Sequence, residues 1–311
     1  MTVASFIREQ PAIARGTVLS PVPPLLEKVL IVGSGTSYHA ARIAAASFAV
    51  PVRVMIPSDA LHDAELKLGP DVLVVGVSQS GRSTGTLAVL DRAEAAGSQT
   101  LLVSGQPSPR HVTLDIGCGP EPVGAKTKGF TATVLTLQAL AGLAPHPGLD
   151  VLLSDLIDRS APTVDALIGT APPTAVHIVT WGSWRPAADE GALKILETSL
   201  LPAEVWDVEE FLHGPHRRLS PTSLLVIVGD RDPRGQRADA LTGFVHGLGA
   251  RVLDVRDLLP DGAPVLAAVI PLQLLAVKLT IARGLSPEAD PFPDFHRLLG
   301  SKHQLGESHH G

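Results

Sequence analysis

The densest group of hydroxyl side chains in this sequence follows directly after an apolar run at residues 72–77. Residues 78–84 read Ser-Gln-Ser-Gly-Arg-Ser-Thr, and a helix is predicted at 87–96. A helix N-terminus offers unpaired amides and the positive end of a dipole, and hydroxyls add donors without bulk. An ordinary capped loop is the common explanation for a Ser/Gly-rich turn, but four hydroxyl residues in seven behind an all-apolar strand favour a phosphate cradle. The sequence lacks G-x-x-x-x-G-K-[ST], so a nucleoside triphosphate is not indicated.

A second loop with ligand-binding residue types follows the apolar run at 29–32. Two glycines begin the dinucleotide pattern G-x-G-x-x-G, but Tyr38 stands where the third glycine would allow close helix packing. The sequence therefore argues against a nicotinamide cofactor. What remains is a strand-to-helix turn in which the hydroxyls of Thr36 and Ser37 lie near free helix amides.

Acid–base chemistry could come from a predicted helix that begins near Ala187. Glu190 and Glu197 lie one heptad apart on it, close to the same face, and Lys194 is within one turn of both. A solvent-facing Glu–Lys pattern is the commonest reason for such spacing. The leucines that flank this group argue against that interpretation, because they leave the helix little surface to expose.

The elements that must position these residues alternate regularly along the chain. Helix-length amphipathic stretches separate short apolar runs at 29–32, 72–77, 176–180, 224–228 and 252–255. Strands that are continuously apolar and separated by helices are typical of parallel sheets covered on both faces. The strand–loop–helix order at 29–47 recurs at 176–200, and turn formers cluster at 144–148. We therefore predict a doubly wound α/β fold with two sheet domains.

Composition excludes several classes of protein. The 311 residues suffice for two domains, and the net charge of −6 gives no general attraction to nucleic acid or an anionic membrane. Residues 1–10 lack the basic and apolar segments of a secretory signal, and no uninterrupted apolar stretch of roughly 18 residues suggests a membrane span. A single cysteine, Cys118, excludes an internal disulfide and argues against a cysteine-based metal cluster. We expect a cytoplasmic protein.

Several segments, taken in order, resemble the sugar isomerase (SIS) family. The resemblance is narrower to the isomerase half of glucosamine-6-phosphate synthase and to its stand-alone relatives, including amino-sugar-phosphate deaminases. Each motif is weak alone, but together they are specific and cover nearly the whole chain. They lie at residues 8–11, 35–38, 78–83, 125–131, 190–199 and 210–215.

The resemblance implies two doubly wound SIS subdomains in tandem with a C-terminal tail. The expected boundaries are an N-terminal segment at 1–19, a first subdomain at 20–147, a second at 148–285 and a tail at 286–311. A phosphosugar would lie at the top of the first sheet. Its phosphate would be held by Ser78, Gln79, Ser80 and Ser83, and Thr36 and Ser37 would meet phosphate or sugar oxygens.

The same resemblance implies the catalytic residues. Glu197 would be the base that moves a proton between C1 and C2 of the open-chain sugar. His213, in a Leu-His-Gly-Pro turn, matches the ring-opening histidine of the family, although a lone histidine among twelve is more often a surface or capping residue. In relatives this histidine reaches the active site of the neighbouring subunit, which implies a homodimer.

A lysine near the C-terminus folds over the sugar in relatives, and in amino-sugar enzymes it can form a Schiff base with the ketose. Lys302 is the suitable match, since Lys278 lies inside the apolar helix expected at 271–283. A solvated tail residue is the alternative interpretation of Lys302. Two further departures leave the substrate open: Arg82 stands where the synthases have glutamate, and Lys126 replaces a small residue that usually faces the sugar.

The expected activity is aldose–ketose proton transfer on a hexose or amino-hexose 6-phosphate, with or without loss of the amine. The proton shuttle needs no metal or cofactor. No glutaminase domain precedes the SIS part, so glutamine-driven synthesis is not expected of this chain by itself. The rival is a non-catalytic phosphosugar sensor, but such proteins usually carry a helix-turn-helix domain, for which residues 1–28 are too short and too uncharged.

Overall fold

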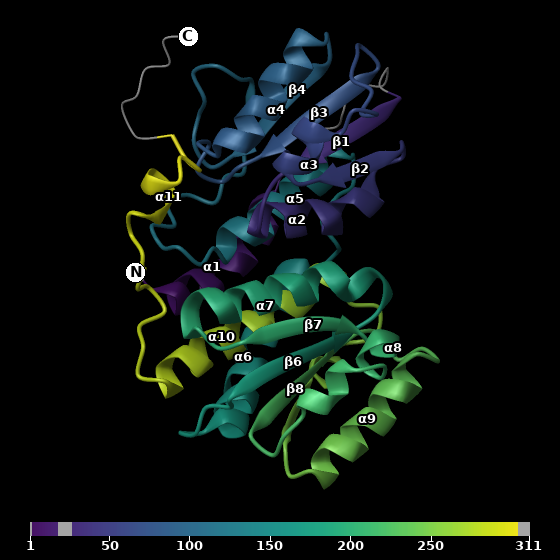
Figure 1. Cartoon of the computed structure of the whole chain (residues 1–311), viewed down its shortest axis with the longest axis vertical. Helices are drawn as coiled ribbons and strands as arrows, with labels where there is room; N and C mark the ends of the chain where they lie inside the picture. The colour runs from purple at the N-terminus through teal and green to yellow at the C-terminus, as the bar shows by residue number, and fades with distance from the viewer. Residues whose placement is uncertain (1, 18–26, 304–311) are drawn as a thin grey trace. The chain divides into compact units, whose positions relative to one another are not determined.

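The computed structural model describes residues 2–17 and 27–303, which form two compact units (Figure 1). The five-stranded unit comprises the described residues within Gly16–Pro122, Lys128–Pro145 and Asp290–Gly311. The four-stranded unit comprises those within Met1–Arg15, Val123–Thr127 and His146–Ala289. The boundary expected between residues 19 and 20 lies outside the described residues. The other expected boundaries stay predictions.

The five-stranded unit has a wholly parallel sheet in the order β2-β1-β3-β4-β5. Its strands are β1 (Lys28–Val32), β2 (Val52–Met55), β3 (Val72–Val77), β4 (Gln99–Ser104) and β5 (Thr113–Asp115). Its helices are α2 (Thr36–Ala44), η1 (Ala45–Ser47), α3 (Pro57–His62), α4 (Thr84–Ala95), α5 (Lys128–Leu140) and α11 (Phe295–Leu298).

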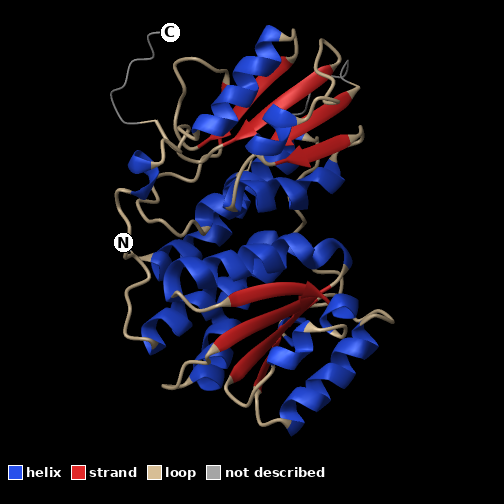
Figure 2. Cartoon of the chain, in the orientation of Figure 1, coloured by secondary structure: helices blue, strands red, loops and turns tan. Residues whose placement is uncertain are grey.

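The central strands of this sheet are apolar because both of their faces are covered. Every residue of β3 is buried, as are the last four residues of β1. The helix α4 contacts β3 and β4, while α2 and α5 pack against each other (Figure 2). A right-handed crossover from β1 to β2 runs opposite in direction to that from β3 to β4, so α2 and α4 cover opposite faces of the sheet.

The four-stranded unit repeats this plan in the order β7-β6-β8-β9, again wholly parallel. Its strands are β6 (Ala175–Thr180), β7 (Ala203–Asp207), β8 (Ser223–Val228) and β9 (Arg251–Asp254). Its longer helices are α1 (Val3–Gly16), α6 (Leu149–Ile168), α7 (Arg185–Ser199), α9 (Gly235–Gly247) and α10 (Val269–Ala282). Short helical turns are η2 (Gly182–Trp184), α8 (Val208–Phe211), η3 (Pro215–Arg218), η4 (Val255–Asp257) and η5 (Val265–Ala268).

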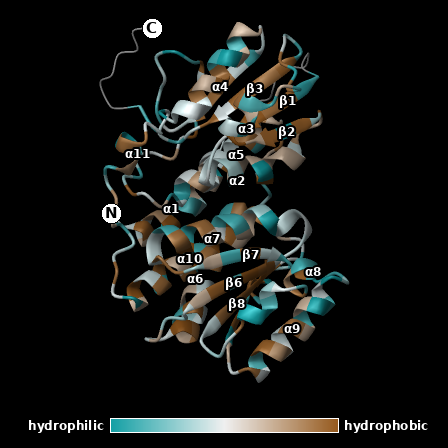
Figure 3. Cartoon of the chain, viewed as in Figure 1, coloured by the Kyte–Doolittle hydropathy of each residue, from teal (hydrophilic) through white to brown (hydrophobic). Residues whose placement is uncertain are grey.

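The most apolar helical segment of the described chain lies within this second unit. Residues Val265–Ala282 are long and apolar enough to span a membrane, but 67% of the segment is buried within the fold. The helix α10 packs against α6 and α7, and the strands β3 and β6 are coloured strongly apolar (Figure 3). This is how the core helix of a compact unit behaves, since an all-round apolar helix is buried by protein as readily as by lipid.

The predicted doubly wound class is confirmed. All five strands that were expected from apolar runs are present, and both sheets reverse their winding direction beside the first strand of the unit. The reversal lies between β1 and β3 in one sheet and between β6 and β8 in the other. Loops that leave the carboxyl ends of strands on either side of such a reversal diverge and leave a crevice, where open α/β sheets bind ligands.

Candidate functional site

The two loops with ligand-binding residue types flank the crevice of the five-stranded sheet. The strands β1 and β3 are hydrogen-bonded neighbours, with Val32 paired to Gly76, so the loops that follow them emerge side by side. The first loop leads into α2, which begins at Thr36, and the second leads into α4, which begins at Thr84. The topology therefore brings together the two segments that sequence patterns selected separately.

Hydroxyl groups inside the second loop are organised by hydrogen bonds to one another. Ser78 is 2% exposed, and its Oγ lies 3.0 Å from Ser83 Oγ and accepts from the Ser83 amide at 3.4 Å. The amide of Arg82 donates to Ser80 Oγ at 3.4 Å. The loop thus closes on itself and holds three serine hydroxyls within a few residues of the start of α4.

Two successive backbone amides of this loop have no internal acceptor. Within the described ranges, the N–H groups of Gln79 and Ser80 donate to no protein atom, whereas those of Ser78 and Gly81 donate to Val103 and Ser78 carbonyls at 3.0 and 2.9 Å. Adjacent free amides form a concavity that suits an anion. With the serine hydroxyls, they supply the donors that phosphate oxygens require.

The C-terminal tail adds a short antiparallel pairing to this loop. Ser83 and Lys302 form an isolated β-bridge, and the amide of His303 donates to the Arg82 carbonyl at 3.0 Å. The amide of Thr84 donates to the Ser301 carbonyl at 3.3 Å. Lys302 lies 219 residues after Ser83 in the sequence. The bridge places this lysine beside the loop at 78–83, here called the hydroxyl loop.

Other predicted substrate-site residues lie in different surroundings. Thr36 and Ser37 occupy the first turn of α2 and are half-buried. Lys126 is also half-buried and lies in the segment Val123–Thr127, which belongs to the four-stranded unit.

The helix α7 carries a charged triad of two buried residues and one exposed residue. Glu190 is fully buried and Lys194 is 2% exposed, while the side chain of Glu197 is 36% exposed. Lys194 Nζ lies 3.3 Å from Glu190 Oε1 and 2.6 Å from Glu197 Oε2. A solvent-facing pattern is thus wrong for two of the three residues.

The leucines expected to bury this helix do not do so. Leu196 and Leu200 are 43% and 50% exposed, so the expectation that flanking leucines leave this helix little exposed surface is wrong, although Glu190 and Lys194 are buried. The buried side of α7 instead packs on α10, where Gly191 lets Leu272 approach. The open side of the helix is the side that presents Glu197.

Lys194 keeps its charge in this position. Burial alone lowers the pKa of Lys194, but the adjacent carboxylates of Glu190 and Glu197 outweigh that effect and raise it above its ordinary value. The ammonium group therefore holds one oxygen of Glu197 in place. The second oxygen, Oε1, accepts no hydrogen bond from the described part of the chain, and a substrate proton could be transferred to it.

His213 lies on the surface of the same unit, just after α8. Its side chain is 72% exposed, and its Nε2 lies 3.6 Å from Glu209 Oε1. No contact between His213 and Glu197 is present among the described residues. The structure therefore brings Ser78, Ser80, Ser83 and Lys302 together within one unit and Glu197 with Lys194 within the other, while His213 stands apart.

The corresponding crevice of the four-stranded sheet is filled by the protein itself. Trp181, at the end of β6, is 1% exposed, and a side chain at Gly229 after β8 would lie 2.3 Å from its ring. The guanidinium of Arg256 lies over the same ring at 5.8 Å. Trp181 thus occupies space at the second crevice, and the candidate binding site is the first crevice, where the serine loop lies.

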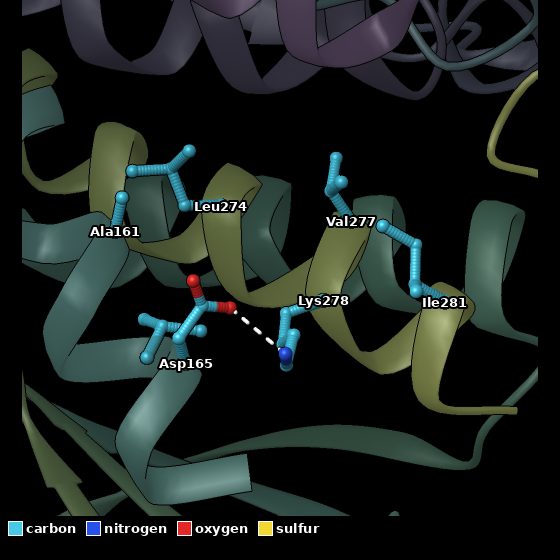
Figure 4. A pocket seen from close by; sticks show the side chains of 7 residues that line it. Ala161, Asp165, Leu274, Val277, Lys278 and Ile281 are labelled. Atoms are coloured by element: carbon cyan, nitrogen blue, oxygen red, sulfur yellow. Dashed lines mark ion pairs between the residues drawn. The ribbon is translucent and has the colours of Figure 1, made fainter. Parts of the chain in front are cut away.

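Lys278 lies at a small open cavity between α6 and α10. The sequence had favoured Lys302 over this residue as the lysine of the site. The cavity, of about 150 Å³, is lined by Ala161, Val164, Asp165, Leu274, Val277, Lys278 and Ile281. Lys278 Nζ pairs with Asp165 at 2.9 Å across it (Figure 4). The other side chains that line the cavity are apolar, so the cavity has few groups that could orient a polar sugar.

One set of side chains has the spacing of metal ligands. Ligand atoms of Asp91, Glu94 and His111 lie within 4.8 Å of one another, near the C-terminal end of α4. His111 Nδ1 lies 3.0 Å from Glu94, and Arg110 pairs with Asp91 at 3.1 Å. Because a cation already neutralises Asp91, this set is an ion-pair cluster that ties α4 to the start of β5.

Comparison with known proteins agrees with this geometry. Residues 27–143 match the SIS domain family. The chain is 29% identical over 302 residues to glutamine–fructose-6-phosphate aminotransferase [isomerizing] of Pyrococcus horikoshii, covering 84% of this chain and 50% of that protein. It thus spans about half the length of this relative.

Solved structures show the same fold over nearly the whole chain. Glucosamine-6-phosphate deaminase of Thermotoga maritima is similar with a TM-score of 0.77 at 20% identity, covering 93% of this chain and 96% of that one. The C-terminal domain of glucosamine-fructose-6-phosphate aminotransferase of Francisella tularensis gives a TM-score of 0.74 at 21% identity, covering 93% and 98%. Residues 27–143 thus carry a SIS domain, as the sequence motifs predicted, and nearly the whole chain shares the fold of these two solved structures.

Proposed function

We propose that this chain is a phosphosugar isomerase that acts on a hexose or amino-hexose 6-phosphate. The observation that carries the proposal is the loop at 78–83, where three serine hydroxyls and two free amides meet at the crevice of the five-stranded sheet. Donors of this kind at a helix N-terminus select a dianionic phosphate. The similarity to sugar-phosphate enzymes supports the same class of substrate.

Phosphate binding would direct energy toward the reacting carbons at the other end of the sugar. Holding the non-reacting phosphate lowers the entropic cost of aligning C1 and C2 with a base. In this proposal Glu197 is that base, since one of its oxygens is fixed by Lys194 and the other is free of internal hydrogen bonds. The proton leaves one carbon for Glu197 Oε1 and returns to the adjacent carbon through an enediol or enolamine.

Ring opening is assigned to His213 and closure over the sugar to Lys302. The exposure of His213 supports a role in the site of a second subunit, because a surface histidine can reach a partner chain. Lys302 is carried to the hydroxyl loop by its bridge to Ser83. We therefore propose a homodimer as the functional unit, with Thr36, Ser37 and Lys126 as additional sugar contacts.

Isomerisation and deamination differ in whether ammonia leaves. Both begin with the same proton transfer, and similar folds are found in the C-terminal domain of an aminotransferase and in a deaminase. The test is incubation with a panel of hexose and amino-hexose 6-phosphates in which ketose and ammonia are measured separately. Ketose formation with any member supports the proposal, whereas binding without turnover or hydrogen exchange on every member favours a phosphosugar sensor.

A further inference from the structure

Gln79 is held by its side chain on the inner side of the hydroxyl loop. Its Nε2 donates to Glu121 Oε2 at 3.0 Å and lies 3.9 Å from Cys118 Sγ. Its backbone carbonyl accepts from the Gly105 amide at 3.1 Å. The side-chain amide is therefore engaged within the protein, and the backbone N–H is the donor that Gln79 can offer to a ligand.

Glu121 joins the loop that carries Gln79 to the start of α5. It is 6% exposed, and besides Gln79 it accepts from the amides of Lys128 and Gly129 at 3.2 and 3.0 Å. These amides begin α5, so the carboxylate satisfies the N-terminus of that helix. A buried carboxylate with several N–H donors is held strongly, because each bond to the charged group is about twice as strong as a neutral one.

Packing fixes Gln79 independently of these hydrogen bonds. A Cβ atom placed on Gly129 would lie 1.9 Å from Gln79 Nε2 and 2.3 Å from its Cδ. No side chain can therefore stand at Gly129 while Gln79 keeps its position. Gly129 and the carboxylate of Glu121 thus both constrain the side-chain amide of Gln79.

We infer that Glu121 is a positioning residue for the phosphate-binding loop, acting through Gln79. By holding the Gln79 side chain, it directs the successive free N–H groups of Gln79 and Ser80 into the crevice. The same carboxylate occupies the N-terminus of α5, so that an incoming anion meets free amides at the 78–83 loop instead. This inference rests on the proposed phosphosugar function, and it assigns Gln79 a backbone contact with phosphate and a structural role for its side chain.

Two measurements test the inference: binding of fructose 6-phosphate, and amide hydrogen exchange of the protein without ligand. Glu121→Gln and Gly129→Ala should each weaken binding by about 10- to 100-fold, the loss expected when a charge-assisted bond no longer orders the donors. The KM should rise while kcat at saturation is retained, since the reacting carbons are untouched. Glu65→Gln, on an exposed loop, and Gly243→Ala, where a Cβ meets nothing within 4 Å, are the matched controls and should bind normally.

A double-mutant cycle separates positioning from general stabilisation. If Glu121 acts through Gln79, then Glu121→Gln combined with Gln79→Ala should lose no more affinity than either change alone. Additive losses would overturn the inference. So would wild-type affinity in both Glu121→Gln and Gly129→Ala, and the second variant keeps the test valid should the first fail to fold.

Amide hydrogen exchange of residues 78–84 without ligand distinguishes this inference from the proposed function. Exchange should be faster in Glu121→Gln than in Glu65→Gln. If the wild type binds no sugar phosphate but this difference is found, the proposed function is wrong and the positioning of the loop by Glu121 stands. Unchanged exchange in Glu121→Gln would contradict the positioning role whatever the protein binds.

Discussion

At the scale of single residues, Ser78 and Ser80 supply two of the three serine hydroxyls in the loop that carries the two free amides. Replacing both serines with alanine should weaken sugar-phosphate binding by about 1.5–3 kcal/mol for each charge-assisted hydrogen bond that is lost. Titration calorimetry with the phosphorylated sugar and with its unphosphorylated counterpart is the measurement. Ser58→Ala, on α3, is the control, and equal affinity of the wild type for both sugars would refute the assignment.

Lys194 offers a second test at this scale, because replacing it with a neutral residue removes the buried cation next to the buried Glu190 carboxylate. We expect Lys194→Met to lower the free energy of unfolding by about 3–5 kcal/mol, the usual cost of an uncompensated buried charge. Lys278→Met removes a lysine whose partner Asp165 is 63% exposed, and should cost about 1 kcal/mol or less. Denaturant unfolding of the two variants measures the difference, and equal losses would show that the triad has no special role in the fold.

Sequence patterns found the residues that belong to a motif and missed those that act through the fold. The hydroxyl loop was visible because its residue types cluster in one segment. Glu121 was missed because it stands alone in a Gly/Pro-rich stretch, and nothing local indicates that its carboxylate meets Gln79 across 42 positions. A glutamate followed seven residues later by a helix start was the available signal, and it is too weak to use alone.

At the scale of elements, the strands with an unbroken apolar run were predicted, including the edge strand β9, whereas β2, β4, β5 and β7 were not. The strands β3 and β8 are entirely buried and therefore read as continuous apolar runs. The edge strands β2 and β5 carry exposed or half-exposed residues, so their sequences have no unbroken apolar signal. The pairing of the tail with the hydroxyl loop was likewise beyond prediction, since it depends on backbone groups and not on side-chain type.

That pairing suggests how the tail acts. His303→Pro removes the N–H that closes the bridge to Arg82 and should release Lys302 from the loop. Turnover should then fall as far as it does in Lys302→Ala, while the stability of the fold changes by only about 1 kcal/mol, the worth of a typical hydrogen bond. Steady-state kinetics of the two variants decides the matter: full activity of His303→Pro would mean that the bridge does not position Lys302.

The strand β6 contains a titratable group that should make stability depend on pH. Burial lowers the pKa of His177, an effect partly offset by the nearby Glu204 carboxylate, and neither ring nitrogen has a hydrogen-bond partner in the described structure. The unfolded chain therefore binds a proton more readily, so stability is complete above about pH 6.5 and is lost as the pH falls below that value. His177→Phe should reduce this loss in unfolding experiments between pH 7.5 and 5.5, and an unchanged pH dependence would show that other groups cause it.

At the scale of the whole molecule, the two units have the same strand order but unequal crevices. In the four-stranded unit, Trp181 packs against Gly229 at the carboxyl ends of β6 and β8. The sequence predicted two sheet domains, because the strand–loop–helix order recurs along the chain. The contact of Trp181 with Gly229 was not predicted, because the two residues lie on loops that follow different strands.

The proposed dimer makes a quantitative prediction for mixed subunits. Glu197→Gln and His213→Ala should each be inactive alone. If His213 serves the partner's site, a mixed dimer contains one site with both groups intact, so random mixing should restore about a quarter of wild-type activity. Size-exclusion chromatography measures whether the variants form dimers. If mixed dimers recover no activity, His213 belongs to the site of its own chain or lies outside catalysis.

The most direct test of the central claim is hydrogen exchange at the reacting carbon in deuterated water. With a turned-over sugar phosphate, the wild type should incorporate deuterium, because Glu197 exchanges the transferred proton with solvent. Glu197→Gln keeps the shape of the side chain but removes the base, so sugar-phosphate affinity should survive while turnover falls by about 10² to 10⁴. Deuterium incorporation by Glu197→Gln at the wild-type rate would contradict the mechanism, and its absence from the wild type on every sugar phosphate would leave a binding protein in place of an enzyme.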